Sequence, residues 1–128
     1  MLVAALTLVI AACGGSDTSL EGQTWTLTNV GDSPAVATAI ATLTFTSGEL
    51  TGNSACNNFS GTYAVDGRSM TIQLGPATLR ACTPDVNAQE TAIFAALDAT
   101  TQFGIAGTEL RLLDDDRTVL ARYTSEPG

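Results

Sequence analysis

Apolar and polar residues alternate along most of the chain. The alternation is clear in residues 24–30, where Trp25 and Leu27 fall on one face. A period of two is typical of half-buried strands. Similar stretches follow at residues 41–46, 49–52, 57–65, 69–74, 103–106, 108–113 and 118–124. The pattern therefore predicts about seven or eight short strands.

Turn-forming residues separate these stretches. Asp66-Gly67 is a strong signal for a two-residue hairpin loop, and Gly75-Pro76 is expected to end the strand that starts at residue 69. Residues 35–41 are small and apolar, and we expect them to form a loop on the core. In the strand before the hairpin, one face carries Phe59, Gly61, Tyr63 and Val65. We expect this face to contact the core and to pack closely at Gly61.

The hydrophobic period becomes helical after Thr83. Thr83 can cap a helix, Pro84 suits its first position, and Asp85 suits its first turn. The positions that follow at helical spacing are Val86, Glu90, Ile93, Phe94 and Leu97. The pattern predicts one amphipathic helix over residues 84–100.

The predicted fold is mainly β, a small antiparallel, partly closed β-barrel of about 7–8 short strands with one α-helix near residues 84–100. Tight turns join neighbouring strands in antiparallel pairs, and closure hides strand edges that would otherwise stay unpaired. The folded domain is expected to cover residues 20–125.

The N-terminal stretch predicts export. Residues 1–12 are apolar apart from Thr7, and they are fewer than the about 20 that a membrane-spanning helix needs. They suit a lipoprotein signal peptide, and the missing positive charge predicts that its start is truncated. Ile10-Ala-Ala-Cys13 resembles a lipobox, so residues 13–19 are predicted to be a lipidated Cys13 and a flexible tether. The alternative is a buried strand or helix with an incidental cysteine.

Two cysteines remain once Cys13 is assigned to the lipid. An even remainder in an exported protein suggests a disulfide between Cys56 and Cys82. Two separately buried thiols are the alternative. A metal or redox pair is disfavoured because the chain has no His and no Cys-x-x-Cys spacing.

Charge and composition argue against several function classes. The chain has 5 basic residues, all Arg, against 13 acidic ones, for a net charge of −8, and this disfavours nucleic-acid binding. The absence of His removes the commonest general base and a Ser-His-Asp triad. We therefore expect no enzyme activity, no cofactor and no bound metal, and we interpret residues 114–116 (Asp-Asp-Asp) as a solvated turn.

Three polar residues are weak candidates for ligand contact. Asn57 and Asn58 suit a backbone bend, and either amide could instead contact a ligand. Arg80 could bind an oxyanion, or it could pair with Asp85 or Glu90.

The chain resembles the META domain of HslJ-like heat-shock proteins and lipoproteins. The matching motifs are Leu20-x4-Trp25-x-Leu27, Gly52-x3-Cys56-Asn57-x-Phe59-x-Gly61-x-Tyr63, Thr78-x-x-Ala81-Cys82, Glu90-x3-Phe94-x2-Leu97 and Leu110-x-Leu112. The family usually has Gly before the first motif cysteine, and Ala55 here speaks against a positive φ. The resemblance implies a compact antiparallel barrel with one helix, in an exported and often lipidated protein linked to stress or drug tolerance. It implies no catalytic residues.

The leading hypothesis is an exported, lipid-anchored cell-envelope domain of a non-enzymatic binding or stress-tolerance type. Its expected partners are the membrane, through the lipid on Cys13, and an envelope protein, with the domain itself a monomer. One alternative is an inhibitor of a lysozyme or protease, acting through a loop at residues 31–38 or 114–117. Another is a carrier that holds a small ligand inside the barrel.

Overall fold

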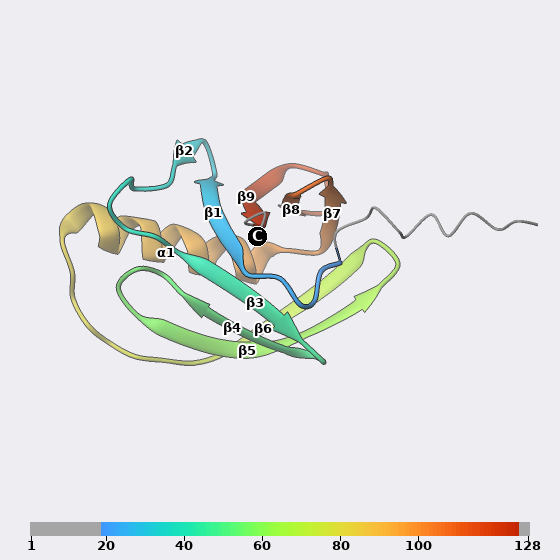
Figure 1. The fold of residues 1–128 in the computed structure, drawn as a ribbon, viewed down its shortest axis with the longest axis horizontal. Helices are drawn as coiled ribbons and strands as arrows, with labels where there is room; N and C mark the ends of the chain where they lie inside the picture. Colours follow the sequence, from blue (N-terminus) through green and yellow to red (C-terminus); the bar gives the residue numbers. More distant parts are fainter. Residues whose placement is uncertain (1–18, 126–128) are drawn as a thin grey trace, which may run out of the picture.

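The computed structural model describes residues 19–125, which form one antiparallel sheet and one helix (Figure 1). The predicted signal peptide, Cys13 and the tether up to residue 18 lie outside the described residues. Within residues 19–125, no helix has the length and apolar character needed to cross a membrane.

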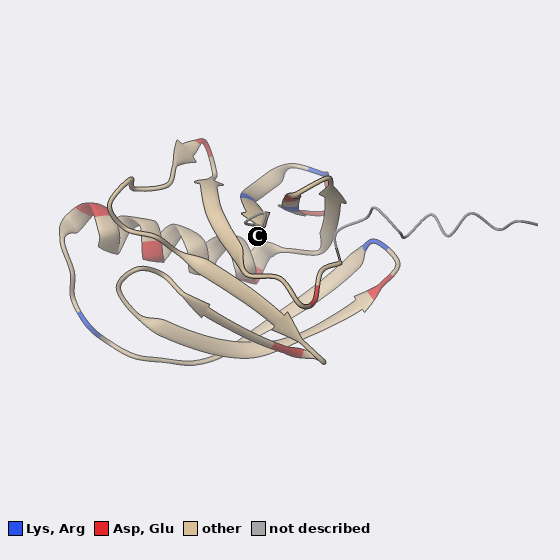
Figure 2. Ribbon diagram, in the orientation of Figure 1, with Lys and Arg blue, Asp and Glu red and all other residues tan. Residues whose placement is uncertain are grey.

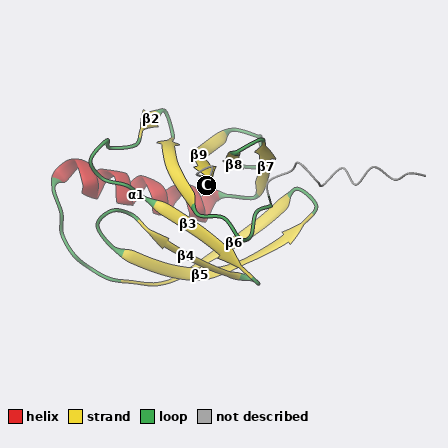
Figure 3. Ribbon diagram, in the orientation of Figure 1, coloured by secondary structure: helices red, strands yellow, loops and turns green. Residues whose placement is uncertain are grey.

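Nine strands and one helix follow the order that the alternating pattern predicts (Figure 3). The strands are β1 (Trp25–Val30), β2 (Ser33–Pro34), β3 (Thr42–Thr46), β4 (Glu49–Asn53), β5 (Asn58–Asp66), β6 (Ser69–Ala77), β7 (Gln102–Ala106), β8 (Glu109–Leu113) and β9 (Val119–Ser125). The helix, α1, spans Pro84–Ala99. The two-residue β2 is the element that the sequence pattern does not predict.

The sheet bends into a partly closed ring because β1 pairs with β9 as well as with β3. The weakest join lies between β6 and β7, where the pairing consists of Ser69 with Gln102. The backbone N–H of Met70 donates to the Thr101 carbonyl there, at 3.0 Å. The predicted fold class is therefore confirmed, with α1 lying against β1, β6, β8 and β9.

Side chains fill the interior of the ring. Trp25 of β1, Leu43 of β3, and Leu110 and Leu112 of β8 are all fully buried in the same core. Trp25 also donates from Nε1 to the Leu20 carbonyl at 2.9 Å, which explains the fixed spacing of the first motif. The other fully buried large side chains are Phe45, Leu50, Met70, Ile93, Leu97 and Tyr123. Residues 35–41 lie on this core as predicted, with Ala39 and Ala41 buried.

The predicted end of the strand at Gly75-Pro76 is wrong. Strand β6 continues to Ala77, and its pairing with β5 shifts register between Phe59 and Gly61. Proline has no N–H for a ladder, and a bulge is one of the few places where a sheet tolerates it. At Gly61, a Cβ would collide with the carbonyl oxygen of Gln73, so the predicted close packing at this glycine is confirmed.

The prediction that Val65 belongs to the core is also wrong. Val65 is 43% exposed, although it pairs with the buried Met70. It stands one pair from the end of the hairpin, where the period-two face continues beyond the packed core. Periodicity identifies a face, but it does not show where along the strand the covering layer stops.

The first turn of α1 differs from the predicted cap. Thr83 occupies the N-cap position with an extended backbone, but its side chain caps no backbone N–H. Its hydroxyl donates instead to the Asp85 carboxylate at 2.6 Å. This bond, followed by the Val86 N–H, lowers the pKa of Asp85 below its ordinary value.

Alkaline pH should destabilise the fold through Tyr123. Complete burial raises the pKa of its hydroxyl well above the ordinary value of about 10. The protonated form is therefore favoured in the folded state, and this stability is fully present below about pH 10 and lost as the pH rises further. Urea midpoints of the protein and of Tyr123→Phe, compared at pH 8 and pH 11, should show a smaller alkaline loss in the variant. An equal loss in both would contradict the assignment to Tyr123.

Candidate functional site

The residues before β5 form a tight turn in which Ala55 has a positive φ of 77°. The N–H of Ser54 donates to the Asn57 carbonyl at 2.9 Å and closes the turn. The Asn53 side-chain oxygen accepts from the Ala55 N–H at 2.7 Å. The expectation that Ala55 would lack a positive φ is therefore wrong, because hydrogen bonds on both sides hold the backbone in this conformation.

Replacing Ala55 with Gly should stabilise the protein by about 1 kcal/mol. Glycine adopts this φ without the clash that a Cβ makes with the neighbouring carbonyl. The measurement is the free energy of unfolding in urea. Ala64→Gly, in the extended and exposed part of β5, is the matched control and should destabilise instead. A loss of stability in Ala55→Gly as well would show that the turn does not strain the alanine.

The structure places Cys56 and Cys82 at disulfide-bonding distance, with their Cα atoms 5.9 Å apart. This supports the disulfide over separately buried thiols. The bond joins the turn before β5 to the residues that lead into α1. Strands β5 and β6 lie between the two cysteines in the sequence.

The side chain of Asn57 holds the segment that follows β6. Its Oδ1 accepts from the Thr78 hydroxyl at 2.9 Å and from the Arg80 N–H at 2.7 Å. Its Nδ2 donates to the Arg80 carbonyl at 3.0 Å and to the Glu90 carboxylate at 2.8 Å. Asn57 is buried and all its hydrogen-bonding capacity is used within the domain, which favours the backbone-bend interpretation over ligand contact.

Helix α1 anchors the same region through two polar side chains. Glu90 accepts from the Ser54 hydroxyl at 2.6 Å in addition to Asn57. Asn87 accepts from the Cys82 N–H at 2.9 Å and donates to the Cys82 carbonyl at 3.0 Å. The first half of α1 therefore fixes both the turn and the incoming chain.

Gln89 is a third anchor that the sequence interpretation missed. It is buried, accepts from the Val36 N–H at 2.7 Å, and donates to the Ala39 carbonyl at 3.2 Å. These bonds fix the loop between β2 and β3 on the helix. The signal was present, because Gln89 stands at helical spacing between Val86 and Ile93 on the face expected to be apolar.

We define the braced segment as residues 78–82, which run from the end of β6 towards α1. Asn57 holds the Thr78 hydroxyl and the Arg80 backbone, and the Thr78 N–H donates to the Asn58 carbonyl at 3.0 Å. The disulfide and Asn87 hold Cys82. Between these fixed points, Leu79 is 95% exposed. The segment thus presents a large apolar side chain on a backbone that is already ordered, an arrangement suited to binding.

Asn58 and Arg80, the other two binding candidates, have different surroundings. Asn58 is exposed, and its side-chain oxygen accepts from Asn53 at 2.6 Å. Arg80 is exposed, and within residues 19–125 its guanidinium forms no ion pair with Asp85 or Glu90. The Arg80 side chain is therefore open to solvent beside Leu79, and its role in binding stays a prediction.

The two loops proposed for an inhibitor are held close to the body of the domain. Residues 31–38 are fixed at Val36 by Gln89. The 114–117 turn is closed by a bond from the Arg117 N–H to the Asp114 carbonyl at 3.0 Å. The Asp114 carboxylate accepts from the N–H groups of Asp116 and Thr118, both at 2.9 Å.

In the described part of the chain, no three acidic, Cys or His side chains gather as a metal site would require.

Comparisons with known proteins agree with this architecture. The family model described as META domain matches residues 18–127. A protein from Burkholderia xenovorans, solved by NMR, is similar with a TM-score of 0.66 and 23% identity over 85% of each chain. A DUF4847 family protein from Bacteroides vulgatus is similar with a TM-score of 0.54 and 18% identity, over 66% of this chain and 57% of that one. Another NMR structure gives a TM-score of 0.60 and 19% identity, over 80% of this chain and 87% of the other.

These structural similarities support the fold alone, because the identities are low. A search of curated proteins finds no match.

Proposed function

Because this chain belongs to the META domain family, we propose that it is an exported, lipid-anchored envelope domain that binds a protein partner and catalyses no reaction. The observation that carries the binding role is the braced segment with its exposed Leu79. The family's link to stress or drug tolerance gives the context in which such binding would act.

Export is supported by the cysteine pair. Disulfides persist in oxidising compartments and are rare in the cytosol. Cys56 and Cys82 lie at bonding distance, and residues 1–12 with the lipobox-like Ile10-Ala-Ala-Cys13 would direct the chain out of the cytosol. A lipid on Cys13 would then hold the domain at the membrane, since two or more acyl chains anchor a protein stably.

Binding through the braced segment is supported by pre-organisation. A partner that covers Leu79 would bury an apolar side chain without first ordering the backbone beside it. Arg80 next to it can donate up to five hydrogen bonds, and arginine is enriched in energetically important interface positions. An apolar anchor with a neighbouring guanidinium fits a protein surface that offers a pocket edged by carboxylates.

The anchoring half of the proposal is tested by growth with labelled palmitate. The full chain should incorporate label and sediment with membranes, whereas Cys13→Ala should do neither. Cys56→Ala is the matched control, and it should keep the label because it leaves the lipobox intact. Absence of label in the unaltered chain would refute lipid anchoring.

The binding half is tested by substituting Leu79. Leu79→Asp should abolish capture of a specific protein from envelope extract, and a photo-crosslinker at position 79 should join the same protein. Ile40→Asp is the matched control, since Ile40 is also a large exposed apolar residue, at 69%, but lies outside the braced segment. Equal capture by the Leu79 and Ile40 variants would remove the braced segment from the proposal.

A hydrolase inhibitor is the second candidate, and the same observation favours it. A rigid segment with one exposed apolar side chain could occupy an enzyme cleft, and the segment would be 78–82 instead of the two loops considered from sequence. Failure to slow lysozymes or envelope proteases at micromolar concentration would count against it. The carrier alternative loses support, because side chains occupy the ring interior in which it would hold its ligand.

A further inference from the structure

A surface hollow of about 410 Å³ lies where the β5–β6 turn, β7 and the β8–β9 turn meet. Three of the five arginines of the chain line it, and among the described residues that form its wall none is acidic. Figure 2 shows basic segments at the β5–β6 turn and around β8 and β9, with acidic segments nearby. The residues used in the argument are Arg68, Gln102, Gly104, Arg111, Leu113 and Arg117.

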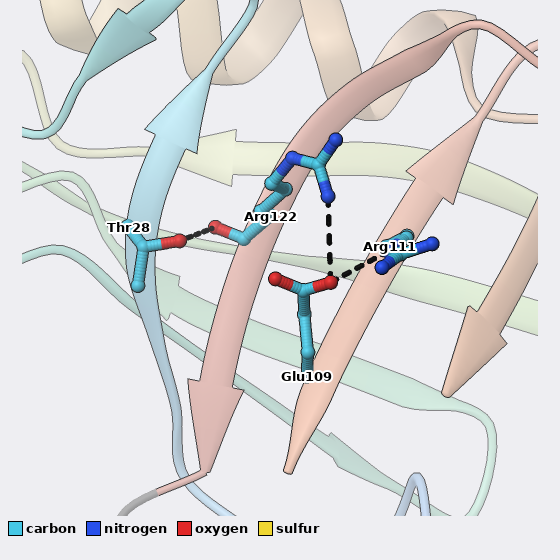
Figure 4. Close-up of polar contacts among 4 residues, drawn as sticks. All are labelled: Thr28, Glu109, Arg111 and Arg122. Atoms are coloured by element: carbon cyan, nitrogen blue, oxygen red, sulfur yellow. Dashed lines mark hydrogen bonds and ion pairs between the residues drawn. The ribbon is translucent and has the colours of Figure 1, made fainter. Parts of the chain in front are cut away.

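The guanidinium groups around the hollow have N–H donors that bind no other described residue. Within residues 19–125, the side chains of Arg68 and Arg117 form no hydrogen bond or ion pair. Arg111 is held from one side, because its Nε donates to Glu109 at 2.5 Å. Figure 4 shows Glu109 between Arg111 and Arg122, with the Arg111 guanidinium on the side away from β9. Its terminal nitrogens therefore stay available on the side that borders the hollow.

Gly104 leaves the space that makes the hollow. It pairs with Arg111 across β7 and β8, and a Cβ built at position 104 meets no atom within 4 Å. Its φ is not in the left-handed region, so neither packing nor backbone conformation requires glycine here. Glycine inside a strand weakens the strand, and one use of it there is to let a ligand approach closely.

Arg117, like Gly104, is a residue type that its local backbone conformation does not favour. Its φ is 64°, in the left-handed region where glycine and asparagine are the usual residues. Non-glycine residues held there cost stability, and such residues cluster at functional sites. Gly104 and Arg117 thus both depart from what the strand and turn prefer, and both border the same hollow.

We propose that this hollow binds a multiply charged oxyanion of the phosphate class. The planar guanidinium fork matches phosphate and carboxylate oxygens with paired hydrogen bonds. Three guanidinium groups around one hollow favour a group that carries more than one negative charge. In a chain of net charge −8, which repels anions overall, such a site requires this local concentration of arginines. The hollow shares no lining residue with the braced segment.

Titration of the full, isotope-labelled chain with pyrophosphate tests the proposal. Arginine side-chain NMR signals of residues 68, 111 and 117 should shift and saturate, and the Arg80 signal should not move. Arg68→Gln, Arg111→Gln and Arg117→Gln should each weaken binding about tenfold, as loss of a charge-assisted hydrogen bond does. Arg80→Gln is the matched control, because it removes the same charge from another exposed position.

Two variants separate binding from stability. Gly104→Val should fill the hollow and abolish pyrophosphate binding, yet keep or raise the thermal midpoint because valine suits a strand. Arg117→Gly should also raise the thermal midpoint while it weakens binding. Opposite changes in stability and affinity are not expected from a merely structural role for these residues.

The source of the phosphate is distinguished by two further probes. Binding of glycerol phosphate with no binding to vesicles that contain phosphatidic acid would indicate a soluble ligand, and binding to these vesicles that Gly104→Val abolishes would indicate a lipid headgroup. Either result supports the oxyanion site. Equal affinity of Arg80→Gln and the three hollow variants for pyrophosphate, or no saturable shift at all, would overturn it.

Discussion

Removal of the Cys56–Cys82 bond should lower the free energy of unfolding by about 3–4 kcal/mol. The two cysteines are 26 residues apart, and the segment that they enclose contains the whole β5–β6 hairpin. A cross-link of this span removes many conformations from the unfolded chain, which is the main source of its stabilising effect in the chain-entropy model. The loss is a large fraction of the about 5–15 kcal/mol that is typical of a whole domain.

The measurement is urea unfolding of the double variant Cys56→Ala/Cys82→Ala against the unaltered chain. Cys13→Ala is the matched control, and it should unfold at the midpoint of the unaltered chain. Reductant should bring the unaltered chain close to the double variant and leave the double variant unchanged. Identical midpoints for the unaltered chain and the double variant, without reductant, would show that the bond contributes no stability.

Most of the strand ladder was predictable because strands such as β1 and β8 are half buried and alternate. Trp25 with Leu27 and Leu110 with Leu112 show this pattern in the sequence and are buried in the structure. The helix was predictable because Pro84 marks its start and the period changes at once. These signals are local, so a single sequence contains them.

The errors occur where hydrogen bonds and packing override the preference of the single residue. Ala55 keeps a positive φ because Asn53 accepts from its N–H and because the Ser54 N–H donates to the Asn57 carbonyl, and the preference of alanine alone does not reveal this. The continuation of β6 through Pro76 depends on a bulge against β5. The exposure of Val65 depends on how far the covering layer extends.

The candidate sites were even less accessible from sequence. Asn57 was singled out, but the three residues that its four side-chain hydrogen bonds reach lie 21 to 33 positions away. The arginines of the hollow come from two turns and a strand, and the join between β6 and β7 brings Arg68 beside Arg111 and Arg117. Their grouping is a product of topology, and spacing along the chain does not reveal it.

Replacing Asn57 with Ala should lower the free energy of unfolding by about 2–4 kcal/mol. The substitution removes four hydrogen bonds and leaves the Arg80 N–H, the Arg80 carbonyl and the Glu90 carboxylate without their buried partner. Because Arg80 is exposed, water can replace part of what is lost, and this keeps the expected loss below the sum of four separate bonds. Urea unfolding measures the loss, and hydrogen exchange at Arg80 should accelerate as the braced segment loosens.

Asn58→Ala is the matched control, since Asn58 is the adjacent asparagine but is exposed, and it should cost less than about 1 kcal/mol. Asn57→Asp sharpens the test, because it keeps the shape and the acceptor while it turns the donor to Glu90 into a second carboxylate. Like charges at this distance repel, so Asn57→Asp should be less stable than Asn57→Ala at pH 7, and the difference should shrink as acid protonates the pair. Equal stability of the Asn57 and Asn58 alanine variants would mean that the amide does not hold the segment. The exposed Leu79 would then lie on a chain with no pre-organised backbone, and the main argument for binding through it would fail.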